Sequence, residues 1–120
     1  MPFQYLLTNL LVDVPEAVGA IFVDPEGEAV EYVTRQGDPY DLKVEGAYQS
    51  IFKRKLEEVS ARTATGPVES YVIEGTELTT LTQSLPDGYH VVLVLDRHGL
   101  PARALYHLRR TAVILAREIA

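Results

Sequence analysis

Histidine, serine and acidic residues provide the side chains of this 120-residue chain that could do chemistry. The chain has three histidines, His90, His98 and His107, and no cysteine, so thiolate chemistry and disulfides are excluded. No two histidines stand four residues apart, the helical spacing that directs two imidazoles at one zinc ion. We therefore expect no metal site, and a surface or turn position for each histidine.

A serine nucleophile is the next candidate. Asp96 and His98 could act as an orienting group and a base, with Ser70 or Ser84 as the nucleophile. Neither serine lies in the glycine-flanked turn that exposes a catalytic hydroxyl. The pattern therefore does not favour a hydrolase.

Close carboxylates and glycines complete the search for a reaction centre. Two pairs of carboxylates, Glu26 with Glu28 and Glu57 with Glu58, fall where solvated charges are expected. A phosphate-binding loop needs several glycines at fixed spacing before a helix, whereas Gly88 and Gly99 are isolated in turns and neither qualifies. The sequence predicts no catalytic residue and no cofactor, and we expect a protein that works through its surface rather than as an enzyme.

Composition and charge narrow the class of protein. The length of 120 residues predicts a single domain, residues 1–120, and 47% of the residues are hydrophobic, which is enough to form a core. No apolar stretch approaches the ~20 residues of a membrane helix, so we expect a cytoplasmic protein without membrane insertion. A net charge of −6 argues against nucleic-acid binding by the whole surface.

The charges are distributed unevenly along the chain. Residues 1–46 carry two basic and nine acidic side chains, whereas residues 97–120 carry five basic and one acidic. Arg103, Arg110 and Arg117 recur every seven residues in the last segment. Arg103 and Arg110 are therefore candidates for binding an acidic partner. The alternative is a solvated face that complements the acidic first half of the chain.

Hydrophobic periodicity predicts the order helix, two strands, helix, three strands and helix. Apolar residues from Phe3 to Val14 follow the spacing of one helix face, and Pro15 ends that helix. A hairpin follows, with a turn at residues 24–27 where proline and glycine supply the backbone angles. The other expected elements are strands at 18–23 and 28–35, a helix at about 42–62, strands at 68–74, 77–85 and 89–95, and a helix from about Pro101.

The strand order follows from burial. A strand covered on both faces forms a continuous apolar run, and only Val18–Val23 and Val91–Leu95 do so. These two are expected to be central neighbours, the hairpin places 28–35 outside the first, and the 68–74 strand lies at the far edge. The prediction is an α+β fold, α-β-β-α-β-β-β-α, with a five-stranded antiparallel sheet in the order 2-1-5-4-3 and helices on both faces.

Two features predict a homodimer. Apolar positions of the second helix cover close to half its circumference, more than the stripe of ~100° that one sheet face needs. The 68–74 strand is an edge with little charge in its middle, and such an edge can pair with another chain. We expect a two-fold dimer whose sheet runs across the interface, formed by Tyr48, Phe52, Leu56, Val68, Tyr71, Val72 and Ile73.

With this element order, three segments resemble the roadblock (dynein light-chain) family, whose fold is also profilin-like. They are Val18–Gly27 with the sequence VGAIFVDPEG, Val72–Leu78 with VIEGTEL, and Val91–Asp96 with VVLVLD leading into an arginine-bearing helix. The first is similar to the family's first hairpin, and the last to its apolar fifth strand and aspartate turn. The resemblance covers the whole chain, although these motifs are structural and describe no reaction.

The resemblance implies a homodimer or heterodimer with a continuous sheet and a Ras-like small GTPase as partner. Bacterial members act on small polarity or motility GTPases, some of them by stimulating GTP hydrolysis. We expect Lys53, Arg54 and Glu57, on the exposed side of the second helix, to contact the GTPase. The alternatives are a structural adaptor without effect on nucleotide turnover, and a small-molecule sensing domain, which would require a cavity.

Overall fold

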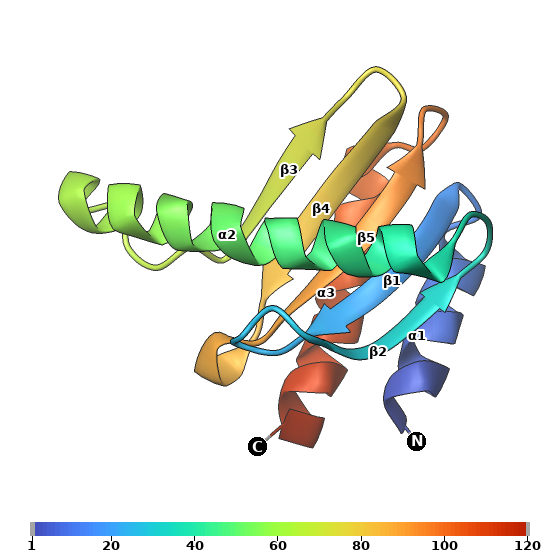
Figure 1. The fold of residues 1–120 in the computed structure, drawn as a ribbon, viewed down its shortest axis with the longest axis horizontal. Coiled ribbons are helices and arrows are strands. Elements are labelled where there is room, and N and C mark those ends of the chain that lie inside the picture. The colour runs from blue at the N-terminus through green and yellow to red at the C-terminus, as the bar shows by residue number, and fades with distance from the viewer. Residues whose placement is uncertain (1, 120) are drawn as a thin grey trace.

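The computed structural model describes residues 2–119 and contains one five-stranded antiparallel sheet in the order β2-β1-β5-β4-β3 (Figure 1). The predicted fold class and strand order are confirmed. No helix within residues 2–119 has the length and apolar character that a membrane crossing requires. The elements are α1 (Pro2–Asp13), β1 (Ala17–Val23), β2 (Ala29–Thr34), α2 (Pro39–Thr63), β3 (Ser70–Glu74), β4 (Leu78–Ser84), the short 3₁₀ helix η1 (Pro86–Gly88), β5 (His90–Asp96) and α3 (Pro101–Ile119).

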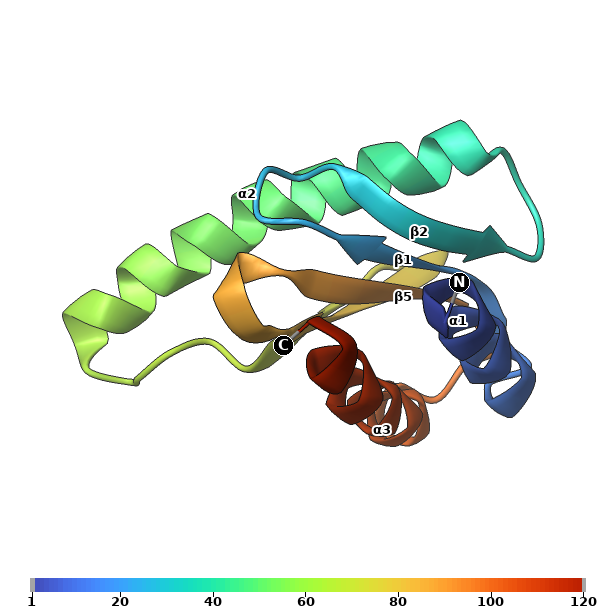
Figure 2. The same ribbon diagram turned by 90° about the horizontal axis from the view of Figure 1, so that it is seen from below.

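Helices cover both faces of the sheet. Figure 2 shows α1 and α3 together on one face and α2 alone on the other. The larger core lies under α1 and α3, where Leu7, Phe22, Leu93 and Leu108 are fully buried. The smaller core lies under α2 and consists of Ile21, Val23, Leu42, Val92 and Val94. Alternate residues of β1 and β5 enter the two cores, which explains why both strands are apolar throughout.

Local capping sets the limits of α2. Asp38 has an extended backbone, and its carboxylate accepts a hydrogen bond from the Tyr40 amide at 2.9 Å. The helix therefore begins at Pro39, three residues before the predicted start, because proline is tolerated in a first turn. It ends where Ala64 adopts the left-handed conformation with φ 56° and donates to the Ser60 carbonyl.

The Arg35 side chain connects the end of β2 to the segment between α1 and β1. Arg35 directly follows β2, and its guanidinium donates to carbonyl oxygens of the α1–β1 connection, including Pro15 at 2.5 Å and Ala17 at 2.8 Å. It also donates to the Leu11 carbonyl in the last turn of α1. Arg35 thus satisfies carbonyls at the negative end of the α1 dipole, besides placing a charge at the sheet edge.

Candidate protein-interaction surface

The face of α2 that lies on the sheet is built from small and polar residues. Gly46 sits so close to β1 that an added Cβ would lie 3.1 Å from Ile21 Cδ1 and from Val23 Cγ2. Gln49 and Ser50 are buried beside it, and Leu42 is the one large apolar side chain of α2 that is buried. The sequence predicts that part of the apolar stripe of α2 packs on the sheet. In the structure, small and polar residues occupy that position instead.

The apolar residues of α2 instead point away from the sheet. We call this surface the α2 apolar face; its exposed members are Tyr48, Ile51, Phe52, Leu56 and Val59, with side chains 38–57% accessible. The rings of Tyr48 and Phe52 stack with centroids 6.4 Å apart. Contiguous exposed apolar surface of this kind marks an interaction site in a folded protein.

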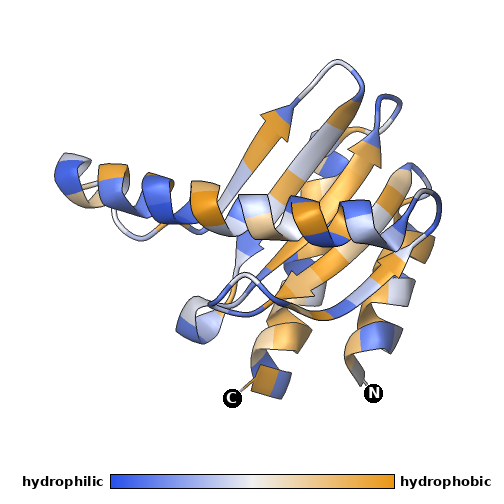
Figure 3. Ribbon diagram, viewed as in Figure 1, coloured by the Kyte–Doolittle hydropathy of each residue, from blue (hydrophilic) through white to orange (hydrophobic). Residues whose placement is uncertain are grey.

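The C-terminal half of α2 projects past the free edge of β3 (Figure 1), with apolar segments on both elements (Figure 3). A hollow of about 620 Å³ lies there, lined by Leu56 and Val59 of α2, by residues 65–69 and by Ser70 and Tyr71 of β3. Among residues 2–119, β3 pairs with β4 alone, so the backbone groups along its outer edge have no partner strand there. The overhang and the unpaired edge together form a surface that the described part of the chain leaves open.

The predicted interface residues of β3 fall on two sides of the sheet. Tyr71 faces α2, and strand alternation places Ile73 on the same side and Val72 on the side of α3. Val68, predicted within the strand, precedes it, and its carbonyl accepts a hydrogen bond from the Ser84 hydroxyl at 2.6 Å. Val72 and Ile73 are exposed at the edge, whereas Val68 and Tyr71 are half-buried.

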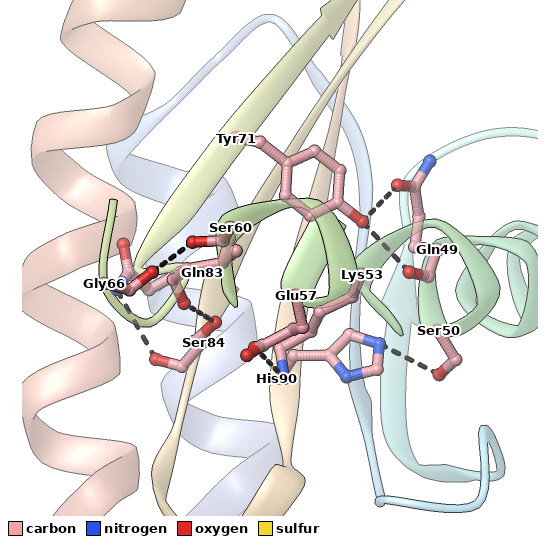
Figure 4. A network of polar contacts seen from close by, with 11 residues as sticks. Gln49, Ser50, Lys53, Glu57, Ser60, Gly66, Tyr71, Gln83, Ser84 and His90 are labelled. Carbon is pink, nitrogen blue, oxygen red and sulfur yellow. Dashed lines mark hydrogen bonds and ion pairs between the residues drawn. The ribbon is translucent and has the colours of Figure 1, made fainter. Parts of the chain in front are cut away.

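A buried glutamine holds α2 at a defined position over β3 and β4 (Figure 4). Gln49 is 1% exposed, and all four hydrogen-bonding positions of its amide are used. Its Nε2 donates to Glu45 at 2.7 Å and Thr80 at 3.3 Å. Its Oε1 accepts from Tyr71 at 2.8 Å and Thr82 at 3.4 Å. Burial raises the pKa of the Tyr71 phenol, which keeps that group a neutral donor.

His90 corrects the expectation of an exposed histidine. It is 1% accessible, and its Nε2 lies 3.2 Å from the Ser50 hydroxyl of α2. Burial is the main cause that lowers the pKa of His90 to about 4, and the positive charge of Lys53 lowers it further. The ring is therefore neutral at physiological pH. His90 thus acts as a neutral packing and hydrogen-bonding group that joins β5 to α2.

The predicted GTPase-contact residues on α2 differ in exposure. Lys53 is not on the exposed side, since its side chain is 13% accessible and pairs with Glu57 at 3.5 Å. Lys53, Arg54 and Glu57 line one groove of about 460 Å³ between α2, the β4–β5 turn and residues 67–68. Arg54 is exposed there and remains available to a partner.

The other predicted partner residues, Arg103 and Arg110, lie on the opposite side of the molecule. Both are exposed on α3, which covers the far face of the sheet from α2 (Figure 2). They do not form one site with Arg54. Within residues 2–119, no group of three histidine, cysteine or acidic side chains is placed to hold a metal ion.

Gln49, Ser50 and Gly46 were not selected from the sequence. Gln49 and Ser50 interrupt a pattern of apolar residues on α2, and Gly46 is a poor helix former in a helix interior. Gln49 and Ser50 follow Gly46 by three and four residues, so all three lie on one helical face. This spacing was the signal in the sequence that the face packs closely against another element.

Comparisons of this chain with known proteins identify its fold. No protein-family model matches the sequence, and no curated protein matches it in a sequence search. A Roadblock/LC7 domain from Streptomyces avermitilis superimposes with a TM-score of 0.87 at 16% identity, covering 97% of this chain and 96% of that domain. The gliding protein MglB from Thermus thermophilus gives 0.86 at 18% identity, covering 97% and 88%.

A more distant likeness extends to profilins. Profilin II from Acanthamoeba castellanii superimposes with a TM-score of 0.67 at 12% identity, covering 98% of both chains. The fold is therefore that of Roadblock/LC7 domains, with the profilin-like arrangement that the sequence predicted.

Proposed function

We propose that this chain forms a homodimer through the α2 apolar face and the β3 edge, and that the dimer binds and regulates a small Ras-like GTPase. The observation that carries the proposal is the apolar surface that α2 presents beside an unpaired strand. The proposal takes residues 1–120 as a single roadblock-type domain of a cytoplasmic protein.

A dimer would cover both the α2 apolar face and the unpaired edge of β3 with one contact. Pairing of two β3 strands about a two-fold axis would satisfy their free backbone groups and extend the sheet across the interface. The overhanging half of each α2 would then lie over the partner's sheet, where Phe52, Leu56 and Val59 would be covered. Ile73, on the same side of β3, would join this contact.

The GTPase part of the proposal is supported by the resemblance and by the fold. The sequence resembles a family whose bacterial members act on motility GTPases, and the gliding protein MglB shares the fold. We expect the dimer to act by contact with the GTPase rather than through a reaction centre of its own. Arg54 is an exposed basic residue of the groove beside α2 and is our candidate for that contact.

A first experiment tests the dimer. Ile73→Lys should shift the mass measured by light scattering from dimer to monomer, because each subunit would place a charged lysine in the apolar contact beside the joined edge. Val30→Lys is the matched control, since Val30 is an exposed valine on the opposite edge strand, β2. A wild-type chain that is monomeric at micromolar concentration, or an Ile73→Lys variant that stays dimeric, would contradict the interface.

A second experiment tests the partner. GTP hydrolysis by a small Ras-like GTPase from the same genome is measured with and without a saturating amount of this protein. Stimulation that is reduced by Arg54→Glu, with the dimer intact, supports a regulator. Binding without any change in hydrolysis would favour the adaptor role instead. Absence of binding would reject the GTPase proposal and leave the dimer to be judged alone.

A further inference from the structure

We propose that the outer surface of α3 is a second docking surface, and that it binds an acidic peptide segment carrying an aromatic or aliphatic side chain. The surface consists of Tyr106, Arg109, Arg110 and Val113, with Leu105 and Ala102 at its margin. It does not depend on the proposed dimer or on the GTPase.

The surface is hollowed and partly apolar. Its residues line a shallow hollow of about 460 Å³. Tyr106 is 59% exposed and Val113 54%, although the helix already buries a full stripe against the sheet through Ala104, Leu108, Ala112 and Leu115. An exposed tyrosine beside an exposed valine is the kind of surface that favours protein contacts, because both supply contact area with little loss of side-chain entropy.

The charge of α3 is uncompensated. Its four arginines are accompanied by one acidic residue, Glu118, whereas residues 1–96 carry sixteen acidic and six basic side chains. Ion pairs among residues 2–119 join Lys53 to Glu57 and Lys55 to Glu58, and none includes an arginine of α3. The acidic majority of the chain therefore does not neutralise this helix through direct contacts. Carboxylates from another molecule would complement it.

Two of the arginines are held in place beside the hollow. The Arg110 guanidinium lies 5.8 Å from the centroid of the Tyr106 ring, within the range of a cation–π contact. Arg109 Nη2 donates to the Ser70 hydroxyl at 3.3 Å, which links α3 to the start of β3. Ser70 lies on the side of the sheet that α3 covers, so this bond holds Arg109 beside the sheet.

A peptide fits these observations better than a membrane or a nucleic acid. The basic surface is narrow, it contains apolar side chains, and the rest of the molecule is acidic and would be repelled by an extended anionic surface. The side chains form a hollow that an aromatic or aliphatic residue could occupy, with arginines on its rim for flanking carboxylates. Because α3 lies on the opposite face from α2, the surface stays open when α2 is covered (Figure 2).

Selection from a phage-displayed library of random peptides of about 12 residues tests the proposal with the full chain as bait. We expect enriched peptides to combine several Asp or Glu residues with one aromatic or aliphatic residue. A fluorescein-labelled synthetic copy of an enriched peptide should bind the wild-type protein and lose about tenfold or more in affinity to Arg109→Glu/Arg110→Glu. Tyr106→Ala should weaken the same peptide, because the apolar contact is removed.

Arg97→Glu is the matched control, since it reverses an exposed arginine of the turn before α3, outside the hollow, and should leave peptide binding unchanged. Circular dichroism melts verify that each variant is folded. The proposal is overturned if the library yields no acidic peptides, or if these bind Arg109→Glu/Arg110→Glu with wild-type affinity. It is also overturned if vesicles with about 30% phosphatidylserine, but no acidic peptide, bind in an Arg109- and Arg110-dependent manner.

Discussion

Replacing Gln49 by methionine should destabilise the protein by about 2–3 kcal/mol, although the two side chains have similar volume. Methionine fills the space but provides neither the donors nor the acceptor of the buried amide. The carboxylate of Glu45 loses a bond of 2.7 Å, and the hydroxyl of Thr82, which is 1% exposed, loses its acceptor. Tyr71 loses the 2.8 Å bond and keeps the Gln49 carbonyl at 2.9 Å.

The magnitude follows from these partners taken one by one. A buried hydroxyl left without an acceptor costs about 1–3 kcal/mol, and this applies to Thr82. Glu45 is half-buried and can exchange Gln49 for water, so its contribution is about 1 kcal/mol or less. Tyr71 retains a second acceptor, and Thr80 loses only a long bond of 3.3 Å to its hydroxyl oxygen, so both contributions are small in the single variant. No cavity term is added, because the volume is conserved.

Urea unfolding measures this effect, at two protein concentrations so that any loss of dimer stability is separated from loss within one chain. Gln4→Met is the matched control, because Gln4 is exposed on α1 and its replacement should change stability by less than about 0.5 kcal/mol. A cycle of Gln49→Met, Tyr71→Phe and the double variant should give a coupling energy of about 1 kcal/mol. A Gln49→Met variant as stable as wild type, or a coupling near zero, would refute the network as a stabilising unit.

Three further perturbations probe other parts of the fold. Arg35→Ala should lower the free energy of unfolding by about 1–3 kcal/mol, since several carbonyls lose a charged donor, whereas Arg97→Ala on an exposed turn should be neutral in the same urea assay. Gly46→Leu should lower the melting temperature strongly and alter the near-ultraviolet spectrum, because a side chain there forces α2 away from β1; an unchanged melt would contradict the close packing. Because the native pKa of His90 is about 4 and the unfolded value is 6.5, protonation favours the unfolded chain, so stability should be full above pH 6.5 and fall by on the order of 3 kcal/mol towards pH 4. His90→Gln should show a shallower pH dependence of unfolding over this range, and equal slopes would exclude His90 as the cause.

Hydrophobic period and turn chemistry determined the architecture of this protein from the sequence. Continuous apolar runs identified β1 and β5 as central strands, since only strands with helices on both faces need apolar residues at every position. The Asp24–Gly27 turn predicted the first hairpin, and the 68–74 segment was recognised as an edge. These features are local or depend on average burial, so a single sequence contains them.

Tertiary structure decided which way α2 faces and what holds it. Amphipathic periodicity indicates that one side of a helix is apolar. It does not indicate whether that side packs on the protein's own sheet or binds another molecule. Gly46 permits a close approach of α2 to β1, since an added Cβ would crowd Ile21 and Val23 at 3.1 Å. The amide of Gln49 finds its partners on β3 and β4, more than 30 residues away for Thr80 and Thr82. Contacts at that separation depend on chain topology, and they turn the apolar residues of α2 outward, where a partner can bind them.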